Sequence, residues 1–185
     1  MASRAEPVSL RRPQPTDFDE LARLYKASQT HFHGRASSDF DQSRFAKTLA
    51  DSEWASNEYF LICNGDDSAI AGTINLSQIF FGGFQNAYLG YQLFAGFTGR
   101  GLMTEAVRQI LEFAFADLGL HRVEANVQPG NFPSIRVLER SGFTREGFSR
   151  RYLKIAGRWR DHERWAIIRE DWKKRKTNDS CPGDR

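Results

Sequence analysis

Cysteine and methionine are scarce in this chain of 185 residues, which contains two of each. Cys63 and Cys181 are far apart, so the disulfide framework that holds many small secreted domains together is not expected. No apolar run approaches the roughly 18 residues that a membrane-spanning helix needs. Residues 1–10 also lack the apolar core of a signal peptide. These absences predict a soluble protein of the reducing cytoplasm that makes no membrane contact.

The composition is otherwise that of a folded protein. Hydrophobic residues make up 40% of the chain, 15 residues are Phe, and 26% are charged, which argues against disorder and low-complexity structure. A chain of this length buries roughly 70% of its unfolded surface in one core. We therefore expect a single domain over residues 1–172, followed by a polar, basic and flexible tail over residues 173–185.

Positive charge is concentrated near the C-terminus. Between Arg145 and Lys176 there are 12 Lys or Arg residues against 5 Asp or Glu, whereas the rest of the chain is slightly acidic. Such an excess suits an acidic partner, either a nucleotide phosphate or ribosomal RNA. It is equally typical of a solvated surface that ends in a Lys-rich tail, and the sequence leaves both interpretations open.

Hydrophobic periodicity predicts an α+β domain. Helical spacing around Phe18–Tyr25 indicates a first helix, and Phe45 with Leu49 indicates a second. The longest predicted helix covers residues 102–118 and ends at Gly119, and a shorter one covers residues 133–141. Alternation and turn residues predict strands over residues 8–12, 59–63, 69–76, 86–93, 122–127, 143–155 and 159–168.

The segment from Gly99 to Glu105 joins a predicted strand to the start of the longest helix. Glycines allow a ligand to approach the backbone closely, and the free N–H groups of a first helical turn bind anions. A pyrophosphate would fit such a site. Two glycines before a helix also commonly form only a tight turn, and the pattern is neither a Walker loop nor the three-glycine dinucleotide motif.

Further motifs follow in a fixed order along the chain. They are Leu89-Gly90-Tyr91, residues 99–106, residues 121–124, Asn131 with Ser134, residues 142–147 and residues 157–162. Together these segments resemble the GNAT superfamily of acyl-CoA N-acyltransferases, specifically the branch that contains the ribosomal-protein N-terminal acetyltransferases. The resemblance implies a mixed, mostly antiparallel sheet that splays at its centre, with helices on both faces and acetyl-CoA in the opening.

The resemblance also implies which residues bind acetyl-CoA. The loop would hold the pyrophosphate through backbone donors, and the preceding strand end would pair with the pantetheine arm. One position departs from the family pattern, because Gly96 stands where Arg or Gln is usual, and Arg100 would have to compensate. The implied cofactor-binding residues are Leu93, Phe94, Gly99, Arg100, Gly101, Leu102, Met103, Thr104, Asn126, Asn131 and Ser134.

Two residues are candidates for catalysis. In the resembling branch the serine of Asn131-x-x-Ser134 lies near the thioester sulfur, so Ser134 would protonate the departing thiolate. Glu124, in an otherwise apolar strand, would accept the proton of the attacking amine, or it would simply pair with Arg122. Asn131 would hold the cofactor arm, cap its helix, or do both. No metal site is expected, because His31 and His33 have no third ligand nearby in the sequence.

The expected reaction is direct acetyl transfer from acetyl-CoA to a protein N-terminal α-amine, such as Ala or Ser of a ribosomal protein. An α-amine has a pKa of about 7.7 to 8.0 against about 10.4 for lysine, so a weak base suffices for it. Two alternatives remain: acetylation of a toxic small molecule or an aminoacyl-nucleotide, and a non-catalytic module that binds the ribosome or RNA. Contact with nucleic acid is otherwise not expected, and the oligomeric state cannot be read from the sequence.

Overall fold

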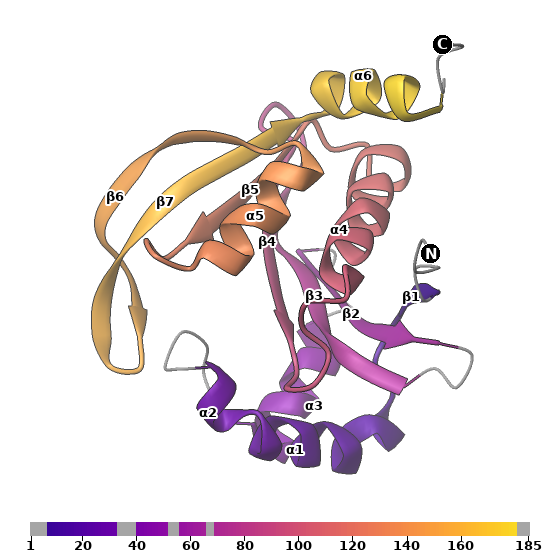
Figure 1. Cartoon of the computed structure of the whole chain (residues 1–185), viewed down its shortest axis with the longest axis vertical. Helices are drawn as coiled ribbons and strands as arrows, with labels where there is room; N and C mark the ends of the chain where they lie inside the picture. The colour runs from indigo at the N-terminus through magenta and orange to yellow at the C-terminus, as the bar shows by residue number, and fades with distance from the viewer. Residues whose placement is uncertain (1–6, 33–39, 52–55, 66–68, 181–185) are drawn as a thin grey trace.

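The computed structural model describes residues 7–32, 40–51, 56–65 and 69–180 (Figure 1). Helices and strands occupy most of this length. The elements are β1 Val8–Arg11, η1 Pro15–Asp17, α1 Phe18–Ala27, α2 Gln29–Phe32, α3 Gln42–Asp51, β2 Asn57–Asn64, β3 Ala69–Phe80, β4 Asn86–Leu93, α4 Leu102–Glu112, η2 Phe113–Asp117, β5 Arg122–Val127, α5 Phe132–Ser141, β6 Thr144–Ile155, β7 Arg158–Ile168 and α6 Arg169–Ser180.

The seven strands form one sheet in the order β1-β2-β3-β4-β5-β7-β6. Every neighbouring pair is antiparallel except β4 and β5, which run parallel. Their pairing is short: Asn86–Tyr88 lie opposite Arg122–Glu124, and beyond Tyr88 the two strands no longer pair. We call the resulting opening between β4 and β5 the fork (Figure 1). The predicted mixed, mostly antiparallel sheet that splays at its centre is confirmed.

Helices cover both faces of the sheet, as predicted (Figure 1). On one face α4 carries the larger core, because Met103, Val107 and Ile110 follow one another at helical spacing and are buried. On the other face α1 and α3 contribute a smaller core, in which Leu21 and Phe45 pack with Phe94. The β4 strand therefore lies between two apolar layers, which fixes its position beside the fork.

The long helix predicted over residues 102–118 changes character near its end. It is α-helical from Leu102 to Glu112 and continues as a π-helix over Phe113–Asp117, where Leu118 N–H donates to the Phe113 carbonyl at 3.0 Å. Gly119, with φ +67°, then allows Leu120 N–H to reach the Ala114 carbonyl. The prediction of a stop at Gly119 agrees with this geometry.

The helix α6 occupies most of the segment to which composition assigned a tail. Trp172 anchors it, because the indole lies 5.3 Å from the Phe115 ring, and Lys176 pairs with Glu112 at 2.7 Å. Helical periodicity gave no signal here, since Trp172 is the only large apolar residue of α6. None of the helices within the described ranges is long and apolar enough to cross a membrane.

Ile110 provides a test of the larger core. Its side chain is fully buried between α4 and the sheet. We expect Ile110→Ala to lower the free energy of unfolding by about 2–5 kcal/mol, because it removes apolar contacts and leaves a cavity. Urea denaturation measures the change, with Lys47→Ala on the exposed surface of α3 as the control. A loss no larger than that of the control would contradict the assignment of α4 to the core.

Candidate active site

A cavity of about 620 Å³ lies beside the fork, and its size suits a cofactor. The end of β4 forms one wall, the N-terminus of α4 and the loop before it form another, and α5 and α2 complete the lining. Eight of the sequence-predicted cofactor residues line it: Leu93, Gly99, Gly101, Leu102, Met103, Thr104, Asn131 and Ser134. Segments about 40 residues apart in the chain are thus brought together.

The N-terminus of α4 is built to accept an anion. Gly101 is the N-cap residue, with φ +79°, and it has no side chain to satisfy the N–H groups of the first turn. Glu105 N–H donates to the Gly101 carbonyl, whereas Leu102, Met103 and Thr104 lie in the turn whose donors have no partner within the helix. The Glu105 carboxylate is held by Arg108 at 2.6 Å, and this contact keeps the pKa of Glu105 below its usual value. The positive end of α4 therefore faces the cavity.

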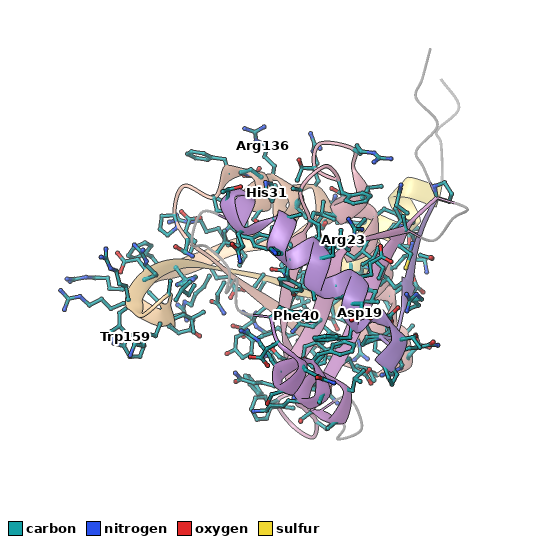
Figure 2. The ribbon with its side chains drawn as sticks, turned by 90° about the horizontal axis from the view of Figure 1, so that it is seen from below. Asp19, Arg23, His31, Phe40, Arg136 and Trp159 are labelled. Atoms are coloured by element: carbon teal, nitrogen blue, oxygen red, sulfur yellow. The ribbon has the colours of Figure 1, made fainter. Side chains whose placement is uncertain are left out.

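Basic side chains that sequence reasoning missed also line the cavity. Arg136 and Arg140 are one turn apart on α5, and His31 comes from α2. In Figure 2, His31 and Arg136 lie at the same end of the molecule. Among the described residues, the lining contains no Asp or Glu. The four-residue spacing of Arg136 and Arg140, immediately after Ser134, is the sequence signal that could have identified them.

A hydrogen bond joins the two sides of the fork. The Tyr91 hydroxyl, from β4, donates to the Ser134 carbonyl oxygen, on α5, at 3.2 Å. Burial raises the pKa of Tyr91, so its hydroxyl stays protonated and remains a donor at neutral pH. The backbone of Ser134 is thus fixed relative to β4, and its hydroxyl is not used in this bond. Tyr91 is a cavity residue that the sequence analysis did not assign.

Asn131 was expected to hold the cofactor arm, to cap its helix, or to do both, and its geometry distinguishes these roles. It occupies the N-cap position of α5, and Ile135 N–H donates to its carbonyl at 3.0 Å. Its side chain, however, makes no capping hydrogen bond. Since Asn131 also lines the cavity, its amide is available to a ligand there.

Three predicted cofactor residues do not line the cavity. Phe94 is completely buried in the smaller core, and its N–H donates to the Ala71 carbonyl at 2.9 Å. Arg100 instead places its guanidinium 5.9 Å from the centre of the Phe97 ring. Asn126 lies on β5 opposite Arg164, and its side-chain oxygen is buried with no hydrogen-bond partner among the described residues. The strand-end pairing therefore stops at Leu93.

Glu124 lies at the closed end of the fork. It is opposite Tyr88 in the last parallel pair of β4 and β5, and its carboxylate accepts a hydrogen bond from Arg122 at 2.9 Å. Arg122 also holds Glu146, whose pKa it lowers. The structure thus shows the ion pair considered as an alternative role, and Glu124 is not part of the cavity lining.

A second hollow of about 370 Å³ lies on the opposite side of the sheet, between the strands and helices α1 and α3. It shares Tyr91 and Gln92 with the first cavity. Its floor is polar and includes Thr73 and Asn75, while Gln92 donates a hydrogen bond to the Tyr25 hydroxyl. Burial raises the pKa of Tyr25, which keeps this hydroxyl neutral. The described lining of this hollow also lacks Asp and Glu.

The comparison with known families decides the identity of this fold and site. Residues 8–144, about three quarters of the chain, match the acetyltransferase (GNAT) domain family. The chain belongs to the GNAT acetyltransferase family. The predicted membership is confirmed, and the fork of this GNAT domain is the place where the family resemblance expected acetyl-CoA.

Two curated relatives are similar over part of their length. A protein named probable N-acetyltransferase YjcK, from Bacillus subtilis, is 46% identical over 113 residues, which cover 61% of this chain and 62% of the relative. The ribosomal protein uS5-alanine N-acetyltransferase of Escherichia coli is 38% identical over 114 residues, covering 62% and 59%. The chain thus spans about three fifths of the length of these relatives.

Solved structures agree with this GNAT fold over nearly the whole chain. Mycobacterium smegmatis RimJ in complex with CoA-disulfide has a TM-score of 0.83 and 29% identity, and the match covers 94% of this chain and 89% of that one. A spermidine N-acetyltransferase from Vibrio cholerae, in complex with CoA and spermine, has a TM-score of 0.77 and 17% identity, with 90% and 98% covered. The second likeness shows the fold alone.

Within the described ranges, no group of three or more His, Cys, Asp or Glu side chains is arranged to hold a metal ion. His31 lines the first cavity, while His33 falls outside the described residues.

Gly101 tests the anion site of this GNAT domain. A Cβ at this position would meet no atom within 4 Å, but φ is +79°, a conformation that costs a β-branched residue roughly 1–2 kcal/mol. We expect Gly101→Val to weaken acetyl-CoA binding about tenfold or more, because the strained loop can no longer present its N–H groups. Isothermal titration calorimetry measures the affinity.

Gly82→Val is the matched control for this experiment. Gly82 has φ +70° and open space around it, in the loop between β3 and β4, away from the cavity lining. It carries the same backbone penalty without touching the anion site. Equal acetyl-CoA affinity in the folded Gly101→Val and Gly82→Val proteins would show that the pyrophosphate does not bind at the loop before α4.

Proposed function

We propose that this protein is an acetyl-CoA-dependent N-acetyltransferase that acts on the α-amine of a protein N-terminus, such as Ala or Ser of a ribosomal protein. The observation that carries the proposal is the cavity at the fork, where unpaired strand edges, the uncapped α4 N-terminus and three basic side chains converge. Acetyl-CoA supplies the activated acetyl group as a thioester, and its phosphates and extended arm fit these three features.

The residues divide the binding of acetyl-CoA between them. The first-turn N–H groups of Leu102, Met103 and Thr104 would receive the pyrophosphate, with Arg136 and Arg140 adding charge on its outer side. The free edge of β4, up to Leu93, would pair with the pantetheine arm as an added strand does. Asn131 would hold the arm from α5 through its uncommitted amide.

Acetyl transfer would proceed by direct attack. The amine nitrogen forms a bond to the thioester carbonyl carbon, the carbon–sulfur bond breaks, and the thiolate takes a proton from Ser134. The Ser134 hydroxyl regains a proton from water, and the amine proton leaves through the base to solvent. Backbone N–H groups along the β4 edge stabilise the oxyanion during the attack. Glu124, at the closed end of the fork beside Tyr88, is our candidate for the base that receives the amine proton, directly or through water.

The acceptor class follows from the second hollow, which we propose as the route of the acceptor to the fork. It meets the first cavity at Tyr91 and Gln92 and offers hydroxyl and amide groups, including those of Tyr25 and Asn75. Peptide groups hydrogen-bond to such a surface. A polyamine carries several positive charges and would need carboxylates, which the described lining of the hollow does not contain. The similarity to the uS5-alanine N-acetyltransferase and to RimJ also favours a protein N-terminus.

Ser134 tests the chemical step. We expect Ser134→Ala to lower turnover about 100- to 10,000-fold, the usual worth of general acid catalysis, with water replacing part of the loss. Acetyl-CoA affinity should change little, because it is the Ser134 carbonyl, not its hydroxyl, that bonds to Tyr91. Steady-state kinetics and calorimetry separate the two effects, with Ser43→Ala on the exposed surface of α3 as the control. Wild-type turnover in Ser134→Ala would end this assignment.

The acceptor amine is tested with a peptide that begins with Ala and contains an internal lysine. We expect acetyl on the α-amine, because a lysine amine costs about 3.4 kcal/mol more to deprotonate and the site shows no strong base. Mass spectrometry of peptide fragments locates the acetyl group, and an N-formylated copy of the peptide is the control.

Other outcomes of that experiment separate the rival functions. Labelling of the lysine alone refutes the preference for the α-amine. Rapid acetylation of spermidine or of an aminoacyl-nucleotide, without peptide labelling, identifies a small-amine acetyltransferase. Absence of turnover on every amine, with intact acetyl-CoA binding, would favour the alternative of a non-catalytic module that binds the ribosome or RNA.

A further inference from the structure

The outer end of the β6–β7 hairpin projects away from the body of the domain. Figure 2 shows Trp159 at this extremity, separated in that view from His31 and Arg136. The hairpin turns at Ala156 and Gly157, both in the left-handed region of φ. We call residues 150–161 the hairpin end. Most of its side chains are exposed, so it forms a convex, two-sided ribbon and not a groove.

The hairpin end is strongly basic. It carries five basic residues and one acid, Asp161, which leaves a net charge of +4. Asp161 accepts the backbone N–H of Arg151 at 2.7 Å and so holds a bulge of β6 in place. No ion pair or side-chain hydrogen bond with another described residue is found for the cations Arg150, Arg151, Lys154, Arg158 and Arg160.

The rest of the basic C-terminal region behaves differently. On α6, Lys176 pairs with Glu112 and Lys174 lies 3.5 Å from Asp171. Arg175 donates to the Arg140 carbonyl at 2.9 Å. Arg175 and Lys176 therefore help to attach α6 to the domain, whereas Lys174 pairs within the helix. The hairpin end differs because five cations without such contacts to described residues lie close together on it.

Large apolar side chains are interleaved with these cations. Trp159 is 61% exposed and Leu153 is 42% exposed. The register pairs Lys154 with Trp159 and Leu153 with Arg160, so each exposed apolar side chain shares a face of the ribbon with a cation. Stacking on a planar partner would remove the exposed indole ring from water, which is energetically favourable.

We propose that the hairpin end binds single-stranded or looped RNA, with phosphates on the arginines and an unstacked base on Trp159. Guanidinium groups match phosphate geometry, and four of the five cations are arginine. Bases in RNA loops are open to stacking on aromatic side chains. An acidic peptide would satisfy the cations but offers no ring to the indole. The choice of RNA over DNA rests on the proposed ribosomal acceptor.

The test is fluorescence anisotropy with a labelled stem–loop RNA, titrated with the full-length protein at several salt concentrations and without acetyl-CoA. We expect Trp159→Ala to weaken binding about 5- to 150-fold, the usual effect of losing one stacked base. Arg158→Ala combined with Arg160→Ala should reduce the slope of log affinity against log salt by about 1.4, because each lost phosphate contact removes about 0.7.

The control variant combines Lys26→Ala with Lys47→Ala, exposed on α1 and α3, and removes the same charge elsewhere. It should bind the RNA almost as the wild type does, and unchanged acetyl-CoA affinity verifies that each variant is folded. If RNA affinity fell equally in the control and in the arginine variant, the loss would depend only on the net charge of the protein, and the proposal would be overturned. So would failure of the wild type to bind RNA, or wild-type affinity in Trp159→Ala.

Two further probes separate the possible partners. A single-stranded DNA of the same sequence should bind more weakly, and preference for the DNA would overturn the choice of RNA. A polyglutamate peptide that binds as tightly as the RNA would instead identify a surface for acidic proteins. RNA binding is measured without turnover, so its failure is distinguishable from failure of peptide acetylation.

Discussion

The parting of β4 from β5 after only three paired residues is the constraint on which the candidate site depends. Each strand is held by its outer neighbour: β4 stays in register with β3 as far as Leu93, and β5 stays in register with β7 as far as Val127. The two strands therefore diverge, and their facing edges keep backbone groups that a bound chain can satisfy. The Tyr91 bond to Ser134 then fixes the distance across it.

Electrostatics supports the same geometry. The glycine N-cap of α4 leaves donors exposed at the positive end of a well-buried helix, and α5 places Arg136 and Arg140 beside it. The nearest carboxylate of α4, Glu105, is held by Arg108 and Gln109. An anionic ligand in the first cavity thus meets positive potential, while the described lining of the second hollow, on the other face, is polar and contains one cation, Arg44, and no carboxylate.

The basic C-terminal region has two different roles in the structure. The part on α6 is bound to the domain through Trp172, Arg175 and Lys176. On the β6–β7 hairpin, Arg145 pairs with Glu163, whereas the cations of the hairpin end form no ion pair with another described residue. The hairpin end lies at an extremity of the molecule (Figure 2).

Local patterns in the sequence determined the strands, the long α4 helix, the glycine turn before it and the Asn131–Ser134 pair, because these features depend on spacing within a few residues. The ordered motifs also pointed to the GNAT fold.

Only the tertiary structure decided which side chains face the cavity. Burial and backbone pairing removed Phe94 from it, Arg100 lies over the Phe97 ring, and chain folding brought in His31, Tyr91, Arg136 and Arg140. Periodicity likewise gave no sign of α6, which is held by contacts of Trp172 and Lys176 with residues about 60 positions away. Such long-range contacts leave no local pattern, since they depend on where the sheet places each element.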